Sequence, residues 1–171
     1  IHIEIKKVYK SFQNKILMSK KINNLYHTLI NDFKITKPKM ILAGINPHAG
    51  ENQTISKDDN KYLLPIINLL KKRGLFIDGP VSGDGMINNQ NLNYYDAFIF
   101  TYHDQALIPF KILSNYQGVN FTSNLDIIRV SPSHGTAENL IGSKKVISNG
   151  IINCFNLIKK INRNRNKIDS S

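Results

Sequence analysis

The chain contains only one cysteine, so a disulfide bond within the chain is impossible. Cys154 lies in the stretch VISNGIINCFNLIKK, whose spacing of apolar residues predicts a helix, and so low a cysteine content is typical of reducing compartments. No apolar run approaches the roughly 20 residues that a membrane-spanning helix requires. These absences predict a soluble protein, and we expect it to be cytoplasmic.

Neither common nucleotide-binding loop is present, because the sequence has no GxGxxG and no GxxxxGK[ST] pattern. The sequence also has no internal repeat, low-complexity block or interdomain linker, and its 41% hydrophobic content suits one ordinary core. We therefore expect residues 1–171 to form a single unit. The short pair HxxxH is absent as well, so any metal site would have to join histidines that lie far apart in the chain.

Positive charge is plentiful, with 23 lysine and arginine residues against 12 aspartate and glutamate residues and a formal net charge of +11. A basic surface is typical of nucleic-acid-binding modules. Here, however, the basic residues are spread along the whole chain, and their densest run, 159–167, lies close to the carboxyl end. We expect 162–171 to be a basic polar tail and expect no nucleic-acid partner, with a basic binding module kept as an alternative.

Helices and strands are predicted to alternate along the chain. Apolar residues recur every three or four positions at 15–34 and 61–73, which is the period of an amphipathic helix. Short apolar or β-branched runs predict strands at 40–45, 76–80, 96–102, 118–122 and 127–131. This alternation predicts an α/β fold with a parallel or mixed sheet and helices on both faces, where ligands bind beyond the carboxyl ends of the strands.

Two histidines follow predicted strands directly. His48 comes after the strand 40–45 in the turn NPHAG, and His103 comes after the strand 96–102 in YHDQ, so both should face one crevice. His2 lies at another segment boundary, whereas His27 falls among the polar positions of a helix and should be a surface residue. Imidazoles from separate loops can converge on a divalent metal. The simpler alternative, in which each histidine bonds its own turn, stays open.

Other polar residues occur near these predicted strand ends. They are Asp84, Asp104, Lys111, Asn120 and Arg129. Charged groups at several strand ends suit an anionic substrate, although each residue taken singly could be ordinary surface charge. The small residues of 133–142 could form a turn at a helix start, where backbone N–H groups bind an anion or a polar ring.

Four segments carry a resemblance to a known family. NPHAGEN (46–52), YDAFIFTYHDQALIPFK (95–111), GVNFT (118–122) and SHGTA (133–137) resemble, in order and spacing, the carboxyl-terminal half of the 4-hydroxythreonine-4-phosphate dehydrogenase family of pyridoxal phosphate (vitamin B6) biosynthesis. The resemblance implies an isocitrate/isopropylmalate dehydrogenase-like fold. It also implies that 1–171 holds the metal, substrate and dimer regions together with part of the dinucleotide-binding region.

The resemblance further implies the chemistry of the family. The activity would be NAD-dependent (or NADP-dependent) and metal-dependent oxidation and decarboxylation of 4-hydroxythreonine 4-phosphate to 3-amino-2-oxopropyl phosphate, in a homodimer whose metal site is shared between subunits. The metal would be zinc, magnesium, cobalt or manganese, and no membrane partner is implied. The implied residues are His2, His48 and His103 for the metal, Lys111, Asn120 and Arg129 for the substrate, Asp84 and Asp104 for catalysis or support, and His134, Gly135, Thr136 and Ala137 for the cofactor.

The sequence departs from the family pattern at three places. Gln53-Thr54-Ile55-Ser56 replaces a Gly-His-Leu-Gly run, Ser133 replaces an aspartate, and Ser123-Asn124-Leu125-Asp126 replaces a Leu-Gly-Leu-Pro turn. The amino-terminal half of the family, with its His-Thr substrate motif, has no counterpart in the chain. Two alternatives therefore remain: a paralogue that acts on another phosphorylated hydroxy acid, such as a four-carbon sugar-acid 4-phosphate, and a catalytically inactive, truncated remnant.

Overall fold

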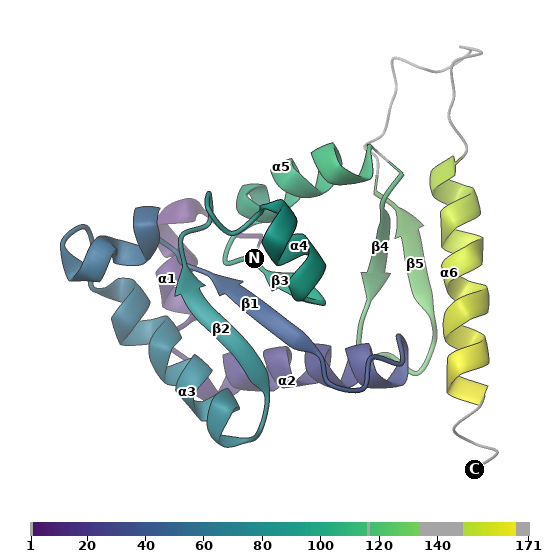
Figure 1. Ribbon diagram of the computed structural model, residues 1–171, viewed down its shortest axis with the longest axis horizontal. Coiled ribbons are helices and arrows are strands. Elements are labelled where there is room, and N and C mark those ends of the chain that lie inside the picture. Colours follow the sequence, from purple (N-terminus) through teal and green to yellow (C-terminus); the bar gives the residue numbers. More distant parts are fainter. Residues whose placement is uncertain (1, 116, 134–148, 167–171) are drawn as a thin grey trace.

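The computed structural model describes residues 2–115, 117–133 and 149–166. In chain order the elements are η1 (Ile5–Lys7), α1 (Val8–Ser11), α2 (Lys15–Asn31), β1 (Lys39–Ala43), η2 (Pro47–Gln53), η3 (Asp59–Leu63), α3 (Leu64–Lys72), β2 (Phe76–Val81), α4 (Asn89–Tyr94), β3 (Ala97–Ile99), α5 (His103–Ser114), β4 (Val119–Thr122), β5 (Arg129–Pro132) and α6 (Asn149–Asn166). Figure 1 shows their arrangement. None of the helices within these ranges is long and apolar enough to cross a bilayer.

A three-stranded parallel sheet, in the order β2-β1-β3, forms the centre of the fold (Figure 1). Its middle strand, β1, is apolar on both faces because successive side chains of a strand point in opposite directions. Met40 and Leu42 face one hydrophobic cluster, whereas Ile41 and Ala43 face another. The predicted α/β class with a parallel sheet is confirmed.

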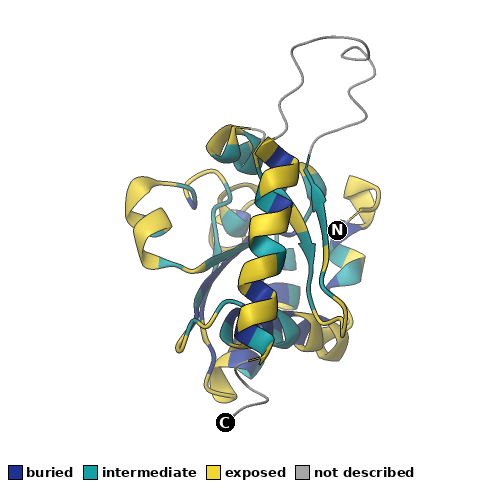
Figure 2. Ribbon diagram, turned by 90° about the vertical axis from the view of Figure 1, so that its right-hand side faces the viewer, coloured by how far each residue is buried: buried dark blue, intermediate teal, exposed yellow. Residues whose placement is uncertain are grey.

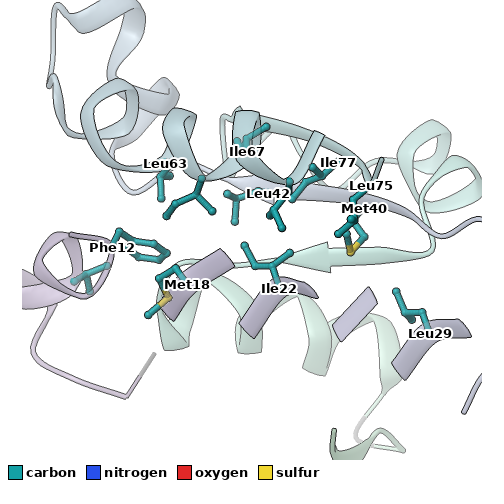
Figure 3. Packing of buried hydrophobic residues seen from close by; sticks show 13 residues of the cluster. Phe12, Met18, Ile22, Leu29, Met40, Leu42, Leu63, Ile67, Leu75 and Ile77 are labelled. Carbon is teal, nitrogen blue, oxygen red and sulfur yellow. The ribbon is translucent and has the colours of Figure 1, made fainter. Parts of the chain in front are cut away.

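Helices α2 and α3 cover the first face of this sheet. Figure 3 shows Met18, Ile22 and Leu29 of α2 directed toward Met40 and Leu42. The three-to-four-residue spacing of these α2 side chains creates the apolar stripe that the sheet buries. The predicted helix 15–34 forms over a shorter range, Lys15–Asn31, and the predicted helix 61–73 is divided between η3 and α3.

The start of α2 has a polar cap. The side chain of Asn14 accepts a hydrogen bond from the backbone N–H of Leu17 at 2.9 Å. Asparagine is among the preferred residues at this position because its side-chain oxygen satisfies an N–H group that has no partner within the helix. The opposite face of the sheet has a smaller cover, in which Met86 and Tyr95, on either side of α4, pack on Ile41 and Ala43.

Strands β4 and β5 form a separate antiparallel pair, in which Asn120 is opposite Ser131 and Thr122 is opposite Arg129. A single parallel or mixed sheet was predicted, so this part of the prediction is corrected. Only residues 123–128 connect the two strands, and such a connection is too short for the crossover that parallel strands need. Helix α6 packs against this pair, with its outward face exposed (Figures 1 and 2).

The carboxyl-terminal helix includes residues that were expected to be a solvated tail. Residues 162–166 form the last part of α6, and the prediction of a basic polar tail is therefore corrected for them, whereas 167–171 lie outside the described residues. Asn164 is buried and donates from Nδ2 to the backbone oxygen of Asp32 at 2.7 Å. The guanidinium of Arg165 binds both carboxylate oxygens of Asp32, at 2.7 and 2.9 Å. Cys154 is buried in the same helix, as its predicted helical setting implied.

Candidate active site

A cleft of about 590 Å³ lies at the carboxyl end of the parallel sheet. Its walls come from the segment after β1, the segment after β2 and the beginning of α5, and they include His48, Asp84 and Asp104. This position agrees with the predicted one, because the carboxyl ends of parallel strands meet at one edge of a sheet. The cleft therefore brings close together residues that lie more than fifty positions apart in the chain, such as His48 and Asp104.

The segment that carries His48 has an unusual backbone. Residues 48–52 all have positive φ angles, from 44° at Glu51 to 81° at Gly50. Residues other than glycine adopt this left-handed region at a cost, so surrounding contacts must hold the turn in place. A Cβ atom at Gly50 would lie 2.4 Å from the backbone oxygen of Ser56, which is too close for any side chain. The glycine that ends NPHAG is therefore required sterically in this turn.

His103 is the first residue of α5 and has two close neighbours. Its Nδ1 atom lies 2.7 Å from Oδ1 of Asp104, and its ring centroid lies 4.3 Å from that of His2. Because Asp104 contacts Nδ1, the Nε2 atom is the nitrogen left for a further ligand. The structure thus brings together two of the three predicted metal ligands, although they are about one hundred positions apart in the sequence.

The third predicted ligand, His48, lies on the wall of the cleft that it shares with Asp104. Within the described ranges, no group of three or more histidine, cysteine, aspartate or glutamate side chains is arranged to hold a metal ion. A single copy of the chain therefore provides a histidine pair and a separate histidine on the cleft wall. It does not gather all three imidazoles around one point.

Asp84 lies in the turn after β2, and its carboxylate accepts a hydrogen bond from the hydroxyl of Ser82. This bond, together with bonds from the backbone N–H groups of Asp84 and Gly85, lowers the pKa of Asp84, and His48 lowers it further by a smaller electrostatic effect. Each of these contacts stabilises the charged form of the carboxylate. Asp84 therefore presents a negative charge to the cleft at neutral pH.

Replacing Ser82 with alanine is expected to raise the pKa of Asp84 toward its ordinary value. A carboxyl with a lowered pKa adds stability above its unfolded-state pKa, and this stability is lost as the pH falls through the folded-state value. The difference in unfolding free energy between wild type and variant should therefore shrink at acidic pH. Carbon-13 NMR titration of the side-chain carboxyls would measure the shift, with Asp84→Asn identifying the resonance. An unchanged pKa in Ser82→Ala would contradict the stated cause.

The three residues proposed for the substrate lie on α5, β4 and β5. Lys111 is half-buried on α5, two turns beyond His103, and Asn120 is exposed in β4. Arg129 begins β5 and donates from Nη1 to Oγ1 of Thr122 at 2.9 Å. Asn120 and Arg129 were both expected near strand ends; Asn120 lies inside β4, whereas Arg129 is the first residue of β5. None of the three lines the part of the cleft that the described residues enclose.

The four residues proposed for the cofactor, His134, Gly135, Thr136 and Ala137, lie outside the described residues. Three further polar residues at or next to the cleft were not predicted from the sequence, namely Asp59, Thr101 and Gln105. Asp59 and Thr101 are fully buried, and all three bond to the segments that carry His48 or His103. The stretch SKDDNK around Asp59 has the composition of a surface loop, so nothing local in the sequence indicates this burial.

Comparisons with known proteins agree with the resemblance. Residues 1–158 match the family described as "Pyridoxal phosphate biosynthetic protein PdxA". The 4-hydroxythreonine-4-phosphate dehydrogenase of Roseobacter denitrificans is 36% identical over 161 residues, which are 94% of this chain and 47% of that protein.

Solved structures agree with the sequence comparison. A 4-hydroxythreonine-4-phosphate dehydrogenase from Burkholderia phymatum superposes with a TM-score of 0.75 and 31% identity, covering 94% of this chain and 48% of that one. The enzyme of the same name from Klebsiella pneumoniae gives a TM-score of 0.77 and 27% identity, covering 96% and 48%. The chain thus spans slightly less than half of the length of these three proteins.

Proposed function

Because the chain belongs to the PdxA family of pyridoxal phosphate biosynthetic proteins, we propose that it takes part in vitamin B6 biosynthesis as a dehydrogenase of 4-hydroxythreonine 4-phosphate. In the proposed reaction the substrate alcohol loses a hydride to NAD or NADP and a proton to a base, and the resulting β-keto acid releases carbon dioxide to give 3-amino-2-oxopropyl phosphate. The cleft with His48, beside the pair of His2 and His103, is the observation that carries this proposal. A cytoplasmic location is part of the proposal, and the single buried cysteine supports it.

The donor set suits a divalent metal. Three imidazoles, from His2, His48 and His103, suit zinc or cobalt better than magnesium, which prefers oxygen ligands. Asp104 beside Nδ1 of His103 is the kind of carboxylate that orients a metal-binding imidazole. A bound metal would stabilise the negative charge that develops on the substrate oxygen.

The incomplete ligand set of one chain supports a homodimer. The described residues of a single copy do not bring three ligands together, so we propose that a second copy completes each metal site. The shared site would then depend on dimer formation as well as on the histidines. Light scattering of the metal-loaded and metal-free protein would measure this dependence.

Asp84 and the proposed substrate residues have separate proposed roles. Asp84, with its lowered pKa, is a weak proton acceptor at neutral pH, because an efficient general base has a pKa near the working pH. Its proposed role is to remain charged and to orient the cations and imidazoles around it. Lys111, Asn120 and Arg129 are proposed to bind the phosphate or carboxylate of the substrate, since guanidinium and ammonium groups match these anions. No step is assigned to the proposed cofactor residues, which lie outside the described ranges.

The test of this function is formation of NADH or NADPH, followed at 340 nm, by the metal-loaded dimer with 4-hydroxythreonine 4-phosphate. Arg129→Ala is expected to raise KM about tenfold, the effect of losing roughly 1.4 kcal/mol of substrate binding, while the metal content stays at the wild-type level. Arg73→Ala, which removes an exposed arginine at the end of α3, is the matched control and should leave KM unchanged.

Three results would change the proposal. Equal loss of metal and substrate binding in Arg129→Ala would contradict a substrate-specific role. Faster turnover of a four-carbon sugar-acid 4-phosphate would identify a paralogue with another substrate. A dimer that binds metal but reduces neither cofactor, even after addition of a polypeptide equivalent to the amino-terminal half of the relatives, would identify an inactive remnant.

A further inference from the structure

Asp59 is a fully buried carboxylate that belongs to none of the roles described above. Both of its oxygens accept hydrogen bonds from the segment that leads to His48. The backbone N–H of Ile45 donates to Oδ1 at 2.7 Å, and Nδ2 of Asn46 donates to Oδ2 at 2.8 Å. Among the described residues, no lysine, arginine or histidine forms an ion pair with it. Burying a carboxyl group without a cationic partner is costly unless its oxygens are hydrogen-bonded, so the bonds from this segment are its main compensation.

The left-handed turn is folded closely around this carboxylate. A Cβ atom at Gly44 would lie 2.8 Å from Oδ1 of Asp59 and 2.8 Å from the Cα atom of Ala49. A Cβ atom at Gly50, on the far side of His48, would lie 3.4 Å from Oδ2. Asp59 therefore lies near the turn both before and after His48.

A second connection joins this turn to the helix that carries His103. Gln105, in the first turn of α5, donates from Nε2 to the backbone oxygen of Gly44 at 2.9 Å. Its Oε1 atom accepts from the backbone N–H and the hydroxyl of Thr101, each at 2.9 Å. The segments that carry His48 and His103 are thus linked through Gly44.

We propose that Asp59 is a positioning residue for His48. Its buried carboxylate holds residues 45 and 46 in place directly before the left-handed residues 48–52 and thereby sets the direction in which the His48 imidazole enters the cleft. Gln105 is the second anchor, because it ties the same turn to α5. The alternative is that Asp59 serves stability alone. In that case its replacement would lower the melting temperature without changing the environment of the imidazole or the metal affinity.

This inference rests on the proposed metal-binding role of His48, so the test has two independent measurements. The variant Asp59→Asn keeps the volume but replaces one acceptor oxygen with an N–H donor, which would face the donors of the turn. The first measurement is the ring resonances of His48 in the metal-free protein, by NMR. The second is the affinity for Co²⁺ alone, by titration calorimetry. Asp58→Asn, the same change at the neighbouring residue, is the matched control because no hydrogen bond of its carboxylate holds the turn.

In Asp59→Asn the His48 resonances are expected to shift, and the affinity for Co²⁺ is expected to fall at least tenfold. Asp58→Asn should leave the resonances in place and change the affinity less than twofold. Wild-type His48 resonances in a folded Asp59→Asn protein would overturn the inference. If Asp59→Asn does not fold, Asn46→Ala is the variant to measure, because it removes only the bond to Oδ2 of Asp59. Asn46→Ala should shift the His48 resonances. Unchanged His48 resonances in Asn46→Ala would overturn the inference.

The two measurements also separate this inference from the proposed function. If wild-type protein does not bind Co²⁺, the proposed metal site fails. The His48 resonances in the metal-free variants then still show whether Asp59 sets the orientation of the ring. If wild-type protein binds Co²⁺ and Asp59→Asn binds it equally well, the metal site stands and the positioning role fails.

Discussion

His103→Ala and His48→Ala are each expected to weaken binding of Zn²⁺ or Co²⁺ by more than about a hundredfold, because even residues that only support a metal ligand commonly contribute 10- to 100-fold. The free energy of unfolding of the metal-free protein should change little. The His103 side chain is 40% exposed, so its removal leaves no large cavity. Metal analysis of the purified proteins, followed by calorimetric titration, would measure the effect, with the mass of the dimer recorded on the same samples.

The control for this prediction is His27→Ala. His27 is exposed on α2 and does not line the cleft, so its removal should leave the metal content unchanged. Loss of metal in His48→Ala and His103→Ala, but not in His27→Ala, would support the proposed ligand set. If His48→Ala and His103→Ala both retain the metal content of the wild type, the assignment of the metal site is wrong.

The second large effect is expected at the junction of α2 and α6. Arg165→Ala should lower the free energy of unfolding by about 2 to 3 kcal/mol, somewhat below the usual cost of breaking a fully buried ion pair because the arginine side chain is 25% exposed. The carboxylate of Asp32, only 6% exposed, would remain without its cation. The backbone oxygens of Leu125 and Asp126 would also lose the Arg165 hydrogen bonds at 3.1 and 3.0 Å. Urea denaturation followed by circular dichroism would measure the change.

Arg163→Ala is the matched control, because Arg163 is an exposed arginine of the same helix and its removal should stay within about 0.5 kcal/mol. Cys154 supplies a second measurement. Burial raises the pKa of its thiol, so the native protein should react slowly with a thiol reagent. If α6 loosens in Arg165→Ala, this reaction should become faster. Wild-type stability and thiol reactivity in Arg165→Ala would show that the bonds between Arg165 and Asp32 do not hold α6 in place.

The positions of α2, α3 and the central strands could be predicted from sequence because their signals are local. Apolar residues three or four positions apart define the buried stripe of α2, and the uninterrupted apolar run of β1 identifies a strand that is buried on both faces. The general rule for parallel sheets then places His48 and His103 near one edge. These patterns involve residues that are close together in the chain. They do not depend on which distant segments pack together in the fold.

The sequence by itself therefore determined the family, the α/β class and the edge of the sheet at which the histidines lie. Only the tertiary structure decided that β4 and β5 pair apart from the parallel sheet, that Arg165 binds Asp32, and that Asp59 is buried beneath the turn of His48. The physical reason is that a charged residue in a polar stretch has the same local pattern whether water or a distant N–H group solvates it. The partner of such a residue depends on how distant segments pack. That packing produces no periodic pattern in the sequence around the residue.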